Sequence, residues 1–311
     1  MPTLRYTRGP ALAVAALLGA CGAELTPAYV ATDGWTVVQS GLEGPVRALA
    51  QSPNGEIFAF GGPVEGPSFA RRLSTGARLA VPSSTRAIDR ARFVGTDLWL
   101  VAEDGVWSGP FDALGRRDLH AKDVTATASG EALLIGDGLT TIGSDGNLRT
   151  LDLIDTASAA PSTGYVRDDG FVWVGGDELL ARVEADGQLR HLDHPDGAHF
   201  RSFEGSSGWV YVVGEAGERG LVLELGTGAT RDIGIGSMPP LYAIRAWGPD
   251  QLWVGGEGGF VARLEGPLWT AWEVPFDRVY AVQPSADGRK VWVGGEVSGA
   301  GAIGLFAPAL D

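Results

Sequence analysis

The sequence lacks the features that hold helical or disulfide-bonded proteins together. It contains one cysteine, Cys21, among 311 residues, so an intrachain disulfide cannot form. Gly and Pro occupy 47 and 18 positions, and the longest stretches without either, 116–129 and 147–160, are rich in Thr, Asp and small side chains. Because Gly and Pro destabilise helix interiors, this composition disfavours a helical architecture and indicates many turns.

Positive charge is also scarce. Lysine occurs only at Lys122 and Lys290, and the formal net charge is −14 at pH 7. A surface of this sign repels phosphate backbones. We therefore expect no nucleic-acid partner.

Motifs of the common enzyme classes are missing as well. No serine lies in a G-x-S-x-G nucleophile elbow, and there is neither a Walker A loop nor a G-x-G-x-x-G turn between a strand and a helix. The residues therefore predict no catalytic group and no cofactor.

The start of the chain has the pattern of an export signal. Arg5 and Arg8 precede an apolar stretch, 11–20, which is too short to span a bilayer as a helix and ends in small residues. We assign residues 1–20 to a signal peptide and residues 21–33 to a tether.

The residues LGAC at 18–21 resemble the lipobox of bacterial lipoproteins. This resemblance implies that signal peptidase II cuts before Cys21, that its thiol carries a diacylglyceryl group, and that the protein is exported and anchored to a membrane by lipid. In that family Gly22, in place of Asp, accompanies sorting to the outer membrane, which implies the outer membrane of a Gram-negative bacterium. The alternative interpretation is an ordinary secretory signal or a buried N-terminal thiol.

One motif recurs along the rest of the chain. Its clearest copy is QLWVGGEGGFVARLEGPL at 251–268. The seven copies are centred on the large residues Phe58, Trp99, Leu133, Trp173, Tyr211, Trp253 and Trp292, which are 34 to 42 positions apart. A repeat of about 40 residues built from short β runs is typical of a propeller blade with four antiparallel strands.

The two ends of the repeat region complete each other. The last copy supplies three strands, 279–283, 291–295 and 302–306, whereas the residues WTVVQS at 35–40 read as a fourth strand with no blade before it. Pairing these segments removes an open sheet edge. We therefore predict an all-β, seven-bladed β-propeller over residues 34–311, with the last blade closed by the N-terminal strand, and we expect a monomer.

The WVGG-x-GG-x-V-x-R pattern, with x-G-x-x-W after it, resembles bacterial neuraminidase-type repeats, photosystem II assembly-factor propellers and two-component-regulator propellers. The resemblance is generic to WD40-like and YVTN-like blades and implies the fold. It carries over no catalytic residues, because the neuraminidase Asp-box, Ser-x-Asp-x-Gly-x-x-Trp, is missing.

Large aromatic residues mark the expected second strands. We predict that Trp99, Trp173, Trp253 and Trp292 fill the space between blades. The glycine pair that follows several of them is predicted to provide a positive φ or a close backbone approach. Trp269 and Trp272 have two interpretations: they belong to the core, or they expose a sugar-binding or protein-binding face.

Three of the four histidines, His191, His194 and His199, cluster in HLDHPDGAH and form the best metal candidate. Side chains alternate between the two faces of an outer strand, so these imidazoles should diverge. We therefore expect solvated loop histidines and no metal.

The first strands of the blades converge on the channel, where propellers usually bind ligands. Aligning these strands on a shared small residue places seven residues at one position: Arg47, Arg90, Val124, Tyr165, Arg201, Tyr242 and Tyr280. The three Arg and three Tyr form the candidate ligand site, suited to an acidic peptide tail, a carboxylate or a sugar. The alternative is a self-satisfied channel in which the nearby Asp89, Asp123, Glu204 and Asp277 pair with the arginines.

These observations favour a lipid-anchored envelope propeller that acts as a non-enzymatic binding or assembly platform for a protein or saccharide ligand. The alternative is an envelope enzyme, a lyase or a glycosidase, at the channel mouth. An enzyme would need a channel histidine or converging carboxylates about 5 to 9.5 Å apart. A purely structural role as an envelope spacer is a third interpretation.

Overall fold

The computed structural model of the chain describes residues 3–5, 34–82, 85–154, 160–206, 208–226, 229–248, 250–285 and 288–307. Cys21 and the predicted tether lie outside these residues. The secondary structure of the described part consists of strands and turns. It contains no helix that is long and apolar enough to cross a membrane.

The strands form seven sheets, and the four strands of each blade are antiparallel. Blades 1 and 2 are β3 (Val46–Gln51), β4 (Ile57–Gly61), β5 (Phe69–Arg72), β6 (Arg78–Leu79) and β7 (Ile88–Val94), β8 (Asp97–Ala102), β9 (Gly105–Gly109), β10 (Gly115–Arg117). Blades 3 and 4 are β11 (Asp123–Ala126), β12 (Ala132–Ile135), β13 (Leu139–Ile142), β14 (Leu148–Leu151) and β15 (Thr163–Val166), β16 (Val172–Gly176), β17 (Leu179–Val183), β18 (Leu189–His191). Blades 5 and 6 are β19 (Ala198–Ser206), β20 (Trp209–Ala216), β21 (Arg219–Leu225), β22 (Thr230–Asp232) and β23 (Leu241–Gly248), β24 (Gln251–Gly256), β25 (Phe260–Glu265), β26 (Leu268–Glu273). Blade 7 is β27 (Arg278–Pro284), β28 (Val291–Val297), β29 (Ala300–Phe306) and β2 (Trp35–Leu42).

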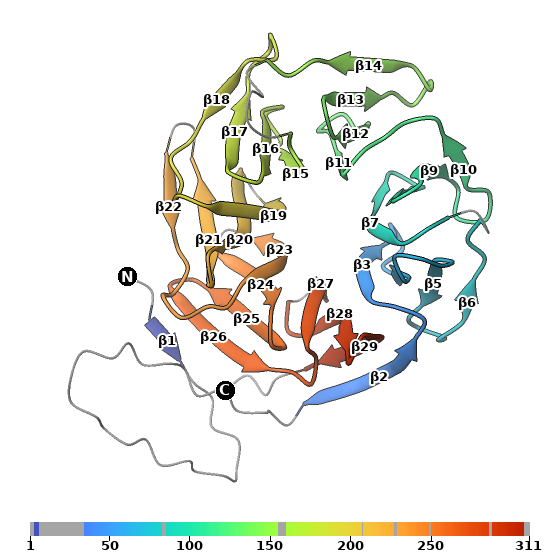
Figure 1. Cartoon of the computed structure of the whole chain (residues 1–311), viewed down its shortest axis with the longest axis vertical. Helices are drawn as coiled ribbons and strands as arrows, with labels where there is room; N and C mark the ends of the chain where they lie inside the picture. Colours follow the sequence, from blue (N-terminus) through green and yellow to red (C-terminus); the bar gives the residue numbers. More distant parts are fainter. Residues whose placement is uncertain are drawn as a thin grey trace.

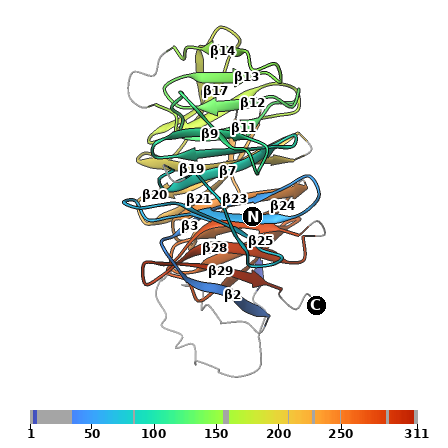
Figure 2. The same ribbon diagram turned by 90° about the vertical axis from the view of Figure 1, so that its right-hand side faces the viewer.

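The blades follow one another around a central axis, and the ring closes where the two ends of the repeat region meet (Figure 1). β2 is the outer strand of blade 7 and pairs antiparallel with β29, with Trp35 opposite Phe306 and Thr36 opposite Leu305. Seen from the side, the blades lie in one flat disc (Figure 2). The seven-bladed fold and its closure by the N-terminal strand confirm the prediction from the sequence.

A further short strand, β1 (Thr3–Arg5), pairs in parallel with β26. It adds a fifth strand to blade 6 of the full-length chain. The assignment of residues 1–20 to a signal peptide stays a prediction.

The core is divided among the interfaces between blades. Within the described residues, seven apolar clusters form, one between each pair of neighbouring blades. The cluster between blades 7 and 1 joins Leu42, Ala281 and Ile303 of blade 7 to Val46 and Leu49 of blade 1. Because every blade is packed on both sides, the ring has no free sheet face within it.

The second-strand tryptophans lie in these clusters, as predicted, with one exception. Trp99, Trp173 and Trp253 are buried, whereas Trp292 is only partly buried. Trp253 stacks on Trp272 with ring centroids 5.5 Å apart, and its indole Nε1 donates a hydrogen bond to the carbonyl oxygen of Gly288 at 3.0 Å.

The two tryptophans of the outer strand β26 also belong to the core. Trp269 and Trp272 are both buried, at 0% and 1% exposure. The indole Nε1 of Trp269 donates a hydrogen bond to the carbonyl oxygen of Ile233 at 2.9 Å. They therefore do not form an exposed binding face.

The glycine pair that ends several second strands is required by close approach and not by a positive φ. A Cβ on Gly255 would lie 2.4 Å from Val279 of the next blade, and a Cβ on Gly256 would lie 2.3 Å from the Pro240 carbonyl oxygen. Neither distance leaves room for a side chain. The first glycine lets the next blade pack directly on the backbone. The second glycine does the same for the segment that leads into the first strand of its own blade.

The Trp253→Ala variant should be destabilised by about 3 to 5 kcal/mol, because it leaves a large cavity between blades 6 and 7. Trp209→Ala is the matched control: Trp209 is 38% exposed at the start of β20, so its loss should cost about 0.5 kcal/mol or less. Urea unfolding followed by circular dichroism measures both. Equal midpoints for the two variants would remove the packing role of Trp253.

Candidate binding site at the channel mouth

Each first strand enters the channel through a β-bulge. In five blades the pairing of the first strand with the second strand skips one residue. In blades 3 and 4 the backbone amides of Lys122 and Ser162 each donate a hydrogen bond to the second-strand residue that pairs with the following residue of the first strand. The bulged residues are Arg47, Asp89, Lys122, Ser162, Arg201, Tyr242 and Tyr280, which we term the bulge ring. A bulge turns its side chain away from the regular alternation, which here sets these residues around the mouth.

The bulge ring contains four of the six residues predicted as a ligand site: Arg47, Arg201, Tyr242 and Tyr280. The alignment of the first strands was wrong in register in three blades, and in blade 3 Val124 lies two residues after the bulged Lys122. Arg90 lies one residue after the bulge of its strand, and Tyr165 lies three residues after. Small residues occur at more than one position of these strands, so an alignment on one of them does not locate the bulge.

Three residues further along each strand lies a second layer, the inner ring. Its members pair directly with the large central residues of the second strands. They are Ala50, Arg92, Thr125, Tyr165, Glu204, Arg245 and Gln283. Tyr165 thus belongs to the interior of the channel, where its hydroxyl donates to the carbonyl oxygen of Gly205 at 3.1 Å.

A buried carboxylate bridges the channel at the level of the inner ring. The Glu204 side chain is 8% exposed; it accepts hydrogen bonds from Arg92 at 3.2 Å and from Arg245 at 2.5 Å. Arg92 belongs to β7 and Glu204 to β19, on opposite sides of the ring (Figure 1). Burial lowers the pKa of Arg92, but the charges of Glu204 and Asp123 offset this, and the pKa lies above its ordinary value. Burial also raises the pKa of Tyr165 to about 12.

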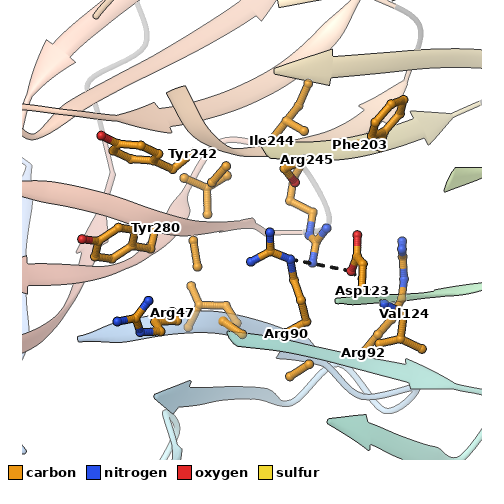
Figure 3. Close-up of a pocket in the computed structure, with 17 residues that line it drawn as sticks. Arg47, Arg90, Arg92, Asp123, Val124, Phe203, Tyr242, Ile244, Arg245 and Tyr280 are labelled. Carbon is orange, nitrogen blue, oxygen red and sulfur yellow. Dashed lines mark hydrogen bonds and ion pairs between the residues drawn. The ribbon is translucent and has the colours of Figure 1, made fainter. Parts of the chain in front are cut away.

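Arg90 forms a second bridge nearer the mouth. Its guanidinium donates to the carbonyl oxygens of Asp89 at 3.0 Å and of Arg201, across the channel, at 2.9 Å. Its Nε lies 3.7 Å from the Asp123 carboxylate. Figure 3 shows Arg90 in the middle of the pocket, with Arg47, Tyr242 and Tyr280 to one side and Asp123 to the other.

A cavity of about 300 Å³ opens at the mouth beside Arg90. It continues inward as a narrower space of about 60 Å³ that reaches Arg92 and Arg245. The outer part is lined by Arg47, Asp89, Arg90, Arg201, Tyr242, Arg278 and Tyr280. Its walls therefore combine forked cationic donors with aromatic rings.

The two tyrosines of the cavity are held in place by carboxylates behind them. Tyr242 donates to Glu257 at 2.5 Å and Tyr280 donates to Glu296 at 3.0 Å, while Arg278 bridges the two carboxylates. Burial and the hydrogen bond to Glu257 raise the pKa of Tyr242, and burial raises the pKa of Tyr280. Both phenols are therefore neutral at physiological pH, with their rings 5.5 Å apart.

The arginines of the mouth have carboxylate partners, but only in part those expected from the sequence. Arg47 pairs with Asp89 at 3.3 Å, as the self-satisfied alternative required. Arg201 pairs with Glu215 at 2.5 Å, which the sequence reading did not identify. Asp277 accepts a hydrogen bond from the backbone of Ser298 and does not pair with these arginines.

One recurring signal could have located the missing partners. Around the ends of the second strands of blades 4 to 7 the sequence reads VGGD, VVGE, VGGE and VGGE, so that Asp177, Glu215, Glu257 and Glu296 share one position. These carboxylates contact first-strand residues at the mouth. The acid after the glycine pair is therefore part of the site architecture.

The histidine cluster is dispersed. His194 lies 3.0 Å from the Pro195 carbonyl oxygen and edge-on to Phe200, whereas His199 is 2.9 Å from the Asp177 carboxylate. Within the described residues, no three His, Cys, Asp or Glu side chains form a group that could hold a metal ion.

Comparisons with known proteins place the fold among β-propellers. No protein-family model matches the chain, and no curated protein sequence shows significant similarity to it. Among solved structures, the WD40 β-propeller domain of Doa1 is similar with a TM-score of 0.66 at 12% identity, covering 87% of this chain and 97% of that one. The Neurospora crassa Pan2 WD40 domain has a TM-score of 0.67 at 11% identity, covering 92% and 99%.

Two further neighbours match propeller types that the sequence resembles. The structure of YCF48 bound to D1 peptide has a TM-score of 0.65 at 13% identity, covering 90% of this chain and 99% of that one. The extracellular domain of a hybrid two component system from B. thetaiotaomicron has a TM-score of 0.67 at 14% identity, covering 86% and 39%. At these identities the likeness establishes the propeller fold.

The Glu204→Gln variant should be destabilised by about 2 to 4 kcal/mol, because it leaves two partly buried arginines without their counter-charge. Glu43→Gln is the matched control: Glu43 is 63% exposed in its pair with Arg78, so its loss should cost less than about 1 kcal/mol. Urea unfolding measures both variants.

Apolar replacement of all three members of the bridge, Arg92→Met, Glu204→Leu and Arg245→Met together, should recover part of the stability lost in Glu204→Gln. A Glu204→Gln variant as stable as Glu43→Gln would show that the bridge does not hold the channel together.

Proposed function

We propose that the protein is a non-enzymatic binding or assembly platform whose ligand, a protein segment or a saccharide, docks at the channel mouth. The observation that carries this proposal is the cavity of about 300 Å³ walled by Arg47, Arg201, Tyr242 and Tyr280. Its volume lies at the lower end of the range of ligand pockets. Its residues sit on bulged strands of a closed ring, which supplies the rigidity that a binding site needs.

One ion pair of the mouth, Arg47–Asp89, is weak enough to be exchanged for a ligand. In the Arg47–Asp89 pair the side chains are 28% and 43% exposed, and such pairs contribute about 0 to 1 kcal/mol. A ligand carboxylate or hydroxyl can therefore replace Asp89 at little cost. The buried bridge at Glu204 is of the opposite kind and forms a fixed floor.

The environment of the carboxylates supports binding over the enzyme alternative. A glycosidase needs two carboxyl groups that converge on the ligand. Asp89 and Asp123, which line the cavities, each face a guanidinium, and Asp123 also accepts hydrogen bonds from Thr163 and Gly164. The oxygens of both carboxylates are therefore engaged with groups of the channel wall itself.

The structure of YCF48 with a D1 peptide is an example of a propeller of this fold that binds a peptide. By analogy it supports a peptide ligand here; the analogy rests on the fold alone.

The proposal extends to the location of the protein. The lipobox-like residues 18–21 support attachment of lipid at Cys21 and an outer-membrane location, with the propeller held beside the membrane by the tether. Anchoring would keep the platform close to envelope partners.

The double variant Arg47→Ala, Arg201→Ala should recover about 10- to 100-fold less partner after crosslinking in native membranes, since each arginine supplies charge-assisted hydrogen bonds. The matched control is Arg78→Ala, Arg149→Ala on the outer strands, where the side chains are 50% and 73% exposed. If a folded Arg47, Arg201 double variant recovers as much partner as this control, the mouth is not the binding site.

The Cys21→Ser variant should lose incorporation of labelled palmitate and should leave the membrane fraction, because the diacylglyceryl group has no thiol to attach to. Gly22→Asp should keep the lipid but shift the protein from the outer to the inner membrane. Palmitate labelling that persists in Cys21→Ser would contradict lipid attachment at this residue.

A further inference from the structure

The Arg90 side chain divides the mouth into two lobes. It reaches from β7 to the Arg201 backbone on β19, and its guanidinium is fixed at both ends. The first lobe is the cavity of about 300 Å³ that is lined by Arg47, Tyr242 and Tyr280. A second cavity, of about 370 Å³, lies on the other side, over blades 2 to 5. The linings of the two cavities share only Asp89, Arg90 and Arg201.

The second lobe has an apolar wall and a charged entrance. Val101, Ala121 and Phe200 supply the apolar wall, and Ser162 and Lys122 belong to the bulge ring at the entrance. A side chain with a short aliphatic stem and a polar head matches these surroundings.

Lys122 is the uncompensated charge of this lobe. Asp89 pairs with Arg47, Arg90 with Asp123, Arg201 with Glu215, and Glu103 lies 3.8 Å from Arg86. Among the described residues, the exposed Lys122 ammonium has neither a hydrogen bond nor an ion pair. The lobe therefore attracts one anionic group of a ligand. A run of anionic groups would be repelled, because the net charge of the chain is −14.

We infer that the second lobe is a binding site for an acidic side chain of a peptide, and that the same extended peptide fills the first lobe. This inference rests on the proposed function. One guanidinium separates the lobes, and an extended chain rises about 3.3 Å per residue, so a few residues cross Arg90. The occupants of both lobes touch Asp89, Arg90 and Arg201, which makes a single continuous ligand the simplest occupant.

The chain offers a direct chemical test, because Lys122 and Lys290 are its only lysines. A carbodiimide activates a carboxylate, the lysine amine attacks it, and an amide forms as the activating group leaves as a urea. Applied to the lipidated protein in its native membrane, the reagent should join Lys122 to an Asp or Glu of another polypeptide. Lys290, in the β27–β28 hairpin at the opposite end of the channel strands, is the internal reference and should form no such amide.

Variants of the two lysines supply the matched controls. Lys122→Glu should lower partner recovery about threefold to fivefold, the range expected for one partly exposed ion pair, whereas Lys290→Glu should leave it unchanged. Lys122→Arg should abolish the amide, because a guanidinium is not coupled, while partner recovery stays near that of the wild type.

The outcomes separate this inference from the proposed function. If the Arg47, Arg201 double variant loses the partner but Lys122→Glu does not, and no amide forms at Lys122, the mouth is a binding site but the second lobe is not part of it. If Lys122→Glu loses the partner but the partner carries no Asp or Glu amide, the ligand is a saccharide and the peptide assignment is overturned. If neither variant loses the partner, both proposals fail.

Discussion

Closure of the ring is the constraint on which the rest of the structure depends. The pairing of β2 with β29 completes blade 7 and brings blade 7 against blade 1, two segments at opposite ends of the repeat region. Across this seam Val46 packs directly on Gly294, where a Cβ would lie 2.6 Å from the Val46 side chain. The Arg47 guanidinium lies over the Tyr280 ring, 5.8 Å from its centroid. The first lobe of the mouth straddles the seam. An open ring would separate the walls of the cavity, so the site exists only because the ring is closed.

In this closed ring the arginines and tyrosines of the mouth come from the first strands, and the carboxylates behind them come from the ends of the second strands. The bulge at one shared register sets seven side chains around the entrance, and the inner ring three residues deeper forms the floor. Glu204 and Arg90 cross the channel from opposite sides, one buried and one half-exposed. The buried bridge at Glu204 is the fixed part of the channel, and the exposed Arg47–Asp89 pair is its exchangeable part.

Much of this architecture follows from the sequence, because the repeat is regular at its glycines and large aromatics. The spacing of Trp173, Trp253 and the other central residues defined seven blades, and the WTVVQS segment predicted the closing strand. Trp292 was expected in the core but is only partly buried. The positive φ considered for the glycine pair is not needed, because close packing of the next blade already excludes a side chain there.

The site was harder to predict, because a β-bulge shifts the register without leaving a residue pattern of its own. Arg47, Arg201, Tyr242 and Tyr280 share one register position, whereas Arg90, Val124 and Tyr165 were aligned with them but lie one, two and three residues further along their strands. Ion pairs across the channel, such as Arg92 with Glu204, join residues more than a hundred positions apart and have no local signal. The acid after the glycine pair did have one, since it recurs from blade to blade.

Native-state amide hydrogen exchange tests ring closure most directly. On the full-length protein, the amides of β2 that pair with β29 should be protected as strongly as those of β28, because both strands belong to one cooperative blade. Rapid exchange throughout β2, with β28 still protected, would show that the ring is open at this seam and would contradict the account.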